Sequence, residues 1–165
     1  MRKAFGQTIV ELAEKDENII LITGDVEFQE IGIFKERFPE RYINIGVCEQ
    51  SMITIAASMA LEGLRPFVYT ITPFLIERPF EQIKIDIDEH NLPVILIGYA
   101  DYPSHGPTHR PLNLEKLVSI FKNIQGYFPK NPEETKKFIL DSYNNRKPAI
   151  ISMKRVELLN EKKTT

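Results

Sequence analysis

The sequence contains no tryptophan, one cysteine and no long run of apolar residues. A single cysteine, Cys48, excludes an internal disulfide, and we expect it to pack as a small hydrophobic residue in a reducing compartment. No apolar run approaches the roughly 18 residues that a transmembrane helix needs. With 21 basic and 23 acidic residues, the net charge of −2 gives no electrostatic reason to expect binding to nucleic acid or to an anionic membrane.

What the sequence does contain is a regular alternation of apolar runs and amphipathic stretches. The apolar runs predict strands at 19–23, 42–45, 66–71, 93–99, 124–128 and 148–153. Between them, periodicity and start signals predict helices at 3–15, 30–38, 75–88 and 132–145, a short one from Leu114 and a central one opened by Glu49. This alternation indicates an α/β fold, a three-layer sandwich with helices on both faces of a mostly parallel six-stranded sheet.

The pattern predicts a single domain, residues 1–158, followed by a polar tail at 159–165. The N-terminal stretch is amphipathic and lacks the continuous apolar core of a signal peptide, so we expect a cytoplasmic protein. In the helix predicted at 75–88, we expect the apolar contacts to come from Phe80, Ile83, Ile85 and Ile87.

The central helix is apolar on nearly every side, because Met52, Ile53, Ile55, Ala56, Ala57, Met59, Ala60 and Leu61 are distributed all round it. Such a helix belongs in the middle of a structure or between subunits. Glu49 in its first turn has two interpretations. A carboxylate there complements the helix dipole and helps to satisfy free N–H groups, or it serves a buried site.

Three segments that follow strands are expected to meet at one end of the sheet, where parallel sheets bind ligands: Gly46–Glu49, Thr70–Phe74 and Tyr99–His109. The last of them contains His105 and His109, and histidine transfers protons or binds substrate hydroxyls near neutral pH. A metal pair of histidines lacks a third ligand here, so we predict no metal site in the chain.

The run NIGVCEQSMITIAASMALEGLRPFV, followed by PFLIERPFEQIKIDI and GPTHRPLNLEKL, resembles the pyrimidine-binding domain of thiamine-diphosphate enzymes. Transketolase and deoxyxylulose-phosphate synthase are the members it resembles most, over residues 3–155. The resemblance implies the fold of that domain. It also implies that Glu49 hydrogen-bonds a ring nitrogen of the cofactor's aminopyrimidine and acts in catalysis. Phe74 and Phe80 correspond to aromatic residues that line the pyrimidine pocket, although either also suits a core position.

The same resemblance suggests substrate contacts. Arg78 suits a phosphate or carboxylate, while a salt bridge with Glu77 or Glu81 explains it equally well. His109 matches a family histidine that contacts the sugar substrate, and we assign it a catalytic role as well. His105 stands where the family has an aspartate, so the identity of the substrate stays open.

The family's diphosphate and metal motif, GDG followed by an asparagine, is absent, because Gly24 and Asp25 are followed by Val26. A diphosphate needs a hard cation with oxygen ligands. We therefore expect thiamine diphosphate with Mg²⁺ held by a separate diphosphate-binding transketolase subunit.

The resemblance thus predicts one subunit of a split enzyme, a homodimer or heterotetramer, that moves a two-carbon ketol unit between sugars or sugar phosphates. A pyruvate-using synthase and a non-catalytic scaffold domain are the alternatives. A hydrolase is not supported, because the sequence has no nucleophile elbow.

Overall fold

The computed structural model describes residues 1–99 and 106–154. Its strands are β1 (Ile19–Thr23), β2 (Tyr42–Asn44), β3 (Arg65–Ile71), β4 (Ile95–Tyr99), β5 (Gln125–Tyr127) and β6 (Ala149–Met153). Its α-helices are α1 (Arg2–Ala13), α2 (Gln29–Arg37), α3 (Glu49–Leu61), α4 (Thr72–Ile76), α5 (Phe80–Gln82), α6 (Leu114–Val118) and α7 (Pro132–Asn145). Short helical turns of other types are η1 (Pro39–Arg41), the π-helical η2 (Ile83–Asp88) and η4 (Pro107–His109).

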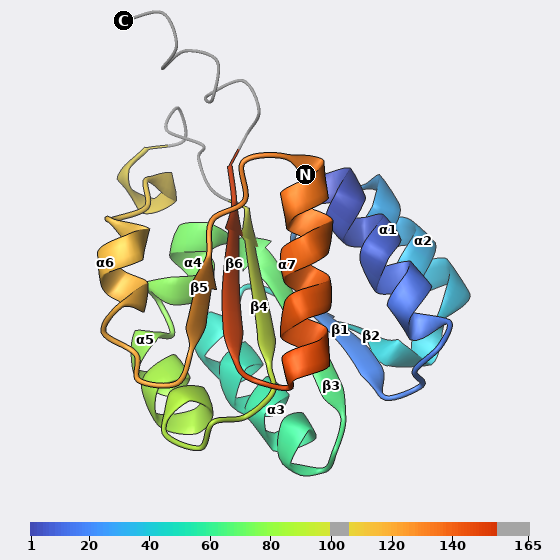
Figure 1. The fold of residues 1–165 in the computed structure, drawn as a ribbon, viewed down its shortest axis with the longest axis horizontal. Helices are drawn as coiled ribbons and strands as arrows, with labels where there is room; N and C mark the ends of the chain where they lie inside the picture. Colours follow the sequence, from blue (N-terminus) through green and yellow to red (C-terminus); the bar gives the residue numbers. More distant parts are fainter. Residues whose placement is uncertain (100–105, 155–165) are drawn as a thin grey trace, which may run out of the picture.

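The six strands form one sheet in the order β2-β1-β3-β4-β6-β5, and every pair is parallel. In Figure 1, α1, α2 and α7 lie on one side of the sheet, and α3, α4, α5 and α6 lie on the other. Strands β1, β4 and β6 are buried along their whole length, as expected for strands covered on both faces. The predicted three-layer α/β fold is confirmed.

Alternate residues of each strand divide the core into two layers. In β1, Ile19 and Leu21 pack toward α1, α2 and α7, whereas Ile20 and Ile22 pack toward α3 and the helices beside it. An unbroken apolar strand therefore supplies both layers, which explains why the strands were visible in the sequence.

The segment predicted as one helix at 75–88 is divided in the structure, so that prediction was wrong. Helix α4 ends at Ile76, and a turn through Arg78 and Pro79 precedes α5 and η2. Proline lacks an N–H and disfavours a helical conformation in the residue before it. Ile85, which was expected to pack, is 46 % exposed.

Helix α3 is buried on the side that faces the sheet, through Met52, Ile53 and neighbouring alanines. Its other side is open in this chain, because Thr54 and Ser58 are exposed and Leu61 is 66 % exposed. A single chain therefore does not bury α3 on every side.

Within the described ranges, no helix combines the length and the apolarity that crossing a membrane requires. The predicted domain end at residue 158 and the tail at 159–165 lie outside the described residues.

Candidate functional site

Glu49 is the first residue of α3 and is held there by a tight turn. Gly46 has a φ of +74°, a backbone conformation that favours glycine. Cys48 donates its backbone N–H to the carbonyl of Gly46 at 2.9 Å and ends the turn as the N-cap residue. The turn leaves the Cys48 side chain exposed, so the prediction that it packs was wrong. The Glu49 carboxyl is buried directly beside it.

The buried carboxyl of Glu49 pairs with Arg78. The Arg78 Nη1 donates to Glu49 Oε1 at 2.6 Å, and the two residues are 29 positions apart in sequence. Neither sequence neighbour of Arg78, Glu77 or Glu81, forms this salt bridge. Glu77 Oε1 instead accepts the backbone N–H of Leu112 at 2.9 Å. The expectation of a local ion pair is therefore replaced by a long-range one.

The guanidinium of Arg78 also lies on the face of the Phe74 ring, with 3.5 Å between Cζ and the ring centroid. This distance is well within the range of a cation–π contact. Arg78 thus touches two residues that the sequence had assigned to one pocket, Glu49 through a hydrogen bond and Phe74 through stacking.

A cavity of about 530 Å³ opens in front of the first turn of α3. It is lined by Val47, Cys48, Glu49, Gln50, Ser51 and Arg78. Its walls combine one buried carboxylate, one guanidinium and the backbone of a helix N-terminus, so it suits a polar, planar group that bonds to Glu49.

His109 lies far from Phe74 in the sequence but close to it in space. The two ring centroids are 4.8 Å apart with the rings 66° to each other, an edge contact. The His109 Nδ1 is 3.1 Å from the hydroxyl of Thr108. The structure therefore brings Glu49, Phe74, Arg78 and His109 into a single chain of contacts.

Phe80, another predicted site residue, is not part of this chain of contacts. Phe80 packs against Phe121, with 5.1 Å between ring centroids, and belongs to the core on the α3 side of the sheet. These are the contacts of a core side chain, and a role for Phe80 in binding stays a prediction. His105 lies outside the described residues.

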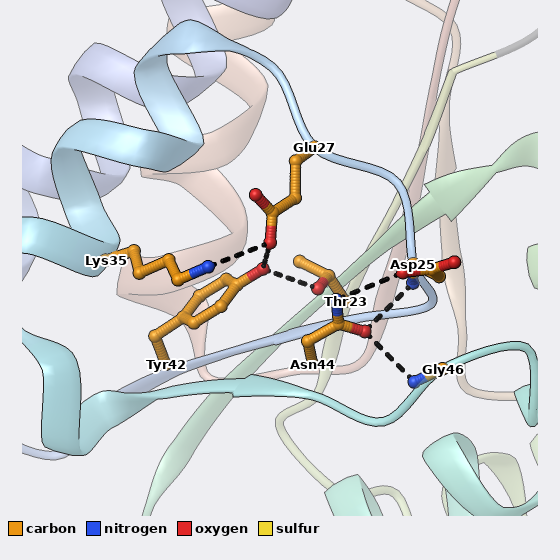
Figure 2. Close-up of polar contacts among 7 residues, drawn as sticks. All are labelled: Thr23, Asp25, Glu27, Lys35, Tyr42, Asn44 and Gly46. Carbon is orange, nitrogen blue, oxygen red and sulfur yellow. Dashed lines mark hydrogen bonds and ion pairs between the residues drawn. The ribbon is translucent and has the colours of Figure 1, made fainter.

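A second polar cluster, which sequence reasoning missed, occupies the ends of β1 and β2 (Figure 2). The Tyr42 hydroxyl donates to Glu27 Oε1 at 2.5 Å and lies 3.0 Å from the Thr23 hydroxyl. Lys35 Nζ is 3.3 Å from the same Glu27 oxygen. Burial and the bond to Glu27 raise the pKa of Tyr42 to about 12. In turn, the Tyr42 hydroxyl lowers the pKa of Glu27.

Asn44 connects this cluster to the turn before Glu49 (Figure 2). Its Oδ1 accepts the backbone N–H groups of Asp25, at 3.2 Å, and Gly46, at 3.0 Å. Its Nδ2 donates to Asp25 Oδ1 at 3.3 Å. An asparagine two residues before a glycine is a turn signal in the sequence that could have been recognised.

No group of three or more His, Cys, Asp or Glu side chains is placed to hold a metal ion among residues 1–99 and 106–154. The Asp25 carboxylate, which follows Gly24 at the end of β1, is bonded to Asn44.

Residues 1–160 match the family model of the transketolase pyrimidine-binding domain. Two similar curated proteins are 1-deoxy-D-xylulose-5-phosphate synthases. The one from Prochlorococcus marinus is 31% identical over 156 residues, and the one from Halothermothrix orenii is 35% identical over 158. These alignments cover 93% and 94% of this chain but 25% of each relative, so the chain spans about a quarter of their length.

Among solved structures, a split-gene transketolase described as an inactive beta4 tetramer superposes with a TM-score of 0.83 and 26% identity. The match covers 93% of this chain and 51% of that one. Transketolase from Leishmania mexicana gives a TM-score of 0.77 at 21% identity, over 93% of this chain and 25% of the other, and this likeness concerns the fold alone.

Proposed function

Because the chain belongs to the family of transketolase pyrimidine-binding domains, we propose that it is the pyrimidine-binding subunit of a split, transketolase-like transferase. One observation carries the proposal. A buried carboxyl, Glu49, opens onto a cavity and bonds a flat N–H donor that is stacked on Phe74. An aminopyrimidine is also flat, forms hydrogen bonds through its ring nitrogens and amino group, and stacks on aromatic rings. The residues present therefore fit the pyrimidine of thiamine diphosphate.

When bound, thiamine diphosphate supplies the chemistry that breaks and forms carbon–carbon bonds beside a carbonyl group. The chain's own contribution is binding and proton handling. Glu49 would hold a proton against the pyrimidine ring nitrogen, Phe74 would hold the ring by stacking, and burial of the carboxyl would keep water away from that bond. Proton-handling groups of this kind contribute about 10²–10⁴ in rate.

We assign the diphosphate and its Mg²⁺ to a partner subunit. The family's GDG motif is absent from this sequence, and a diphosphate requires a cation with oxygen ligands. The likeness to a split-gene transketolase described as an inactive beta4 tetramer supports a chain that self-associates and acts only with its partner. The open side of α3, with the exposed Leu61, is the surface we propose for a homodimer or heterotetramer.

For the reaction, we propose transfer of a two-carbon ketol unit between sugars or sugar phosphates in the cytoplasm. Arg78 and His109, which flank Phe74, are the proposed contacts to the substrate. A pyruvate-using synthase is a second candidate, favoured by identities of 31% and 35% to synthases of that type. Changing His105 to Asp should alter the substrate preference without weakening cofactor binding, and equal losses for every substrate would count against a substrate role for this position.

The direct test is calorimetric titration of thiamine diphosphate with Mg²⁺ into this chain, alone and mixed with a diphosphate-binding transketolase subunit from the same organism. Tight binding in the mixture and weak binding to the chain alone is the expected result. Tight binding to the chain alone would disprove the shared site. Absence of binding in both would favour a non-catalytic scaffold domain.

A further inference from the structure

We infer that Arg78 is an internal ligand of the pocket, which occupies the place of the aminopyrimidine until the cofactor displaces it; the inference rests on the proposed function. The guanidinium already occupies both groups assigned to bind the pyrimidine. It donates to Glu49 Oε1 at 2.6 Å, and it lies 3.5 Å above the Phe74 ring.

Only one member of this ion pair, the buried Glu49, depends on having a partner. The Glu49 side chain is 6 % exposed and the Arg78 side chain 37 %. A buried carboxylate without a partner is strongly unfavourable. A guanidinium on a flexible stem can return to water at little cost, because part of it is already hydrated. Arg78 is therefore the partner that leaves when another flat group that hydrogen-bonds Glu49 arrives.

The position of Arg78 in the chain also allows it to move. It lies between the end of α4 at Ile76 and the start of α5 at Phe80, next to Pro79, and so outside both helices. Its side chain is 37 % exposed on this turn, so it has open solvent into which it can rotate. The carboxyl of Glu49, in contrast, is buried at the first turn of α3.

Two flat groups cannot stack on one face of Phe74 at the same time, so cofactor binding is an exchange. The pyrimidine must replace a partly exposed ion pair, and such pairs are worth up to about 1 kcal/mol. This value corresponds to about a 5-fold loss of affinity relative to an empty pocket. The exchange also excludes weak ligands that cannot both hydrogen-bond to Glu49 and stack on Phe74.

The released guanidinium has a second use. One Arg78 cannot pair with Glu49 and with an anionic substrate group at the same time. Displacement by the pyrimidine therefore delivers it to the phosphate or carboxylate of the substrate. Strong anion binding at this site should follow cofactor binding and not precede it.

The test uses this chain and the pyrimidine half of thiamine, 4-amino-5-hydroxymethyl-2-methylpyrimidine, which needs neither metal nor partner subunit. Affinity is measured by NMR titration for the wild type and for Arg78→Met, which keeps a long apolar stem and removes the guanidinium. We expect Arg78→Met to bind about 5-fold more tightly. Arg110→Met, which removes an exposed arginine of the neighbouring loop, is the matched control and should bind like the wild type.

A second readout follows Arg78 directly in the wild type. Its side-chain protons should be shifted upfield by the Phe74 ring in the free chain and return to ordinary positions as the pyrimidine binds. Equal or weaker binding by Arg78→Met, or pyrimidine binding that leaves these signals in place, would overturn the internal ligand while keeping the proposed function. Failure of every variant to bind the pyrimidine would overturn this inference, whereas the proposed function is decided by the titration of the mixed subunits.

Discussion

Glu49 and Asp88 are both buried carboxylates on the same side of the sheet, yet their surroundings differ. Asp88 Oδ1 accepts the backbone N–H groups of Asn123, at 2.7 Å, and Ile124, at 3.1 Å. Its Oδ2 accepts that of Lys122 at 2.9 Å. In the part of the chain that the structure describes, Glu49 bonds to the side chain of Arg78.

The difference separates a structural carboxylate from an available one. Backbone donors cannot leave Asp88 without unfolding the segment that precedes β5, so Asp88 fastens the end of η2 to it. Arg78 can leave Glu49 by a change of rotamer. Burial alone therefore does not identify a functional carboxylate. A functional carboxylate is identified by partners that can leave it.

The largest effect is expected for Glu49→Gln in the assembled enzyme. Glutamine keeps the shape and a hydrogen bond but cannot exchange a proton, so turnover should fall about 10²–10⁴-fold. The free energy of unfolding should change by less than about 1 kcal/mol, because the partner Arg78 can turn to water. Steady-state kinetics and urea unfolding measure the two quantities. Glu62→Gln, at the other end of α3, is the control, and full activity of Glu49→Gln would refute the assignment.

For Asp88→Ala, in contrast, the large effect is expected in the free energy of unfolding. The change leaves three backbone N–H groups without their acceptor, which should destabilise the fold by about 3 kcal/mol. Urea unfolding of the isolated chain measures the loss, and the exposed neighbour in Glu89→Ala should leave stability nearly unchanged. A loss for Asp88→Ala no larger than that of the control would show that the three bonds do not anchor η2.

The smallest effect is expected for Tyr42→Phe, which tests a third carboxylate, the partly exposed Glu27. Two hydroxyl contacts are lost, for a cost of about 1 kcal/mol at neutral pH. Because the bond lowers the pKa of Glu27, its stabilisation is present above the ordinary value of 4.5 and is lost as pH falls. Because the pKa of Tyr42 is raised from 10.0 to about 12, its stabilisation is complete below pH 10 and is lost as pH rises through 12.

Unfolding free energies measured from pH 3 to pH 12 (the range in which both groups titrate) should therefore converge for Tyr42→Phe and the wild type at both extremes. A constant difference across the range would mean that the hydroxyl acts by packing and not through Glu27.

The sequence was sufficient for the layers of the fold because the strands are continuous apolar runs and the helices carry local start signals, such as Asn131 before Pro132. The sequence was insufficient to predict contacts between residues that lie far apart in the chain. The residues near Arg78 offered Glu77 and Glu81, and nothing local pointed to Glu49, which is 29 positions away.

The anchor at Asp88 was missed for the same reason, since its donors lie 34 to 36 positions further along the chain. The break at Pro79 is different, because the signal was present. The apolar spacing of Ile83 and Ile87 outweighed it in the prediction of one helix.

The exposed cysteine also gives the chain a built-in attachment point. Cys48 is the single thiol of the sequence, lies on the wall of the cavity and is adjacent to Glu49. A maleimide dye would therefore label each chain once, beside the pocket, without any engineered residue. Its emission would report the arrival of a second subunit over the cavity, so that assembly could be timed separately from turnover.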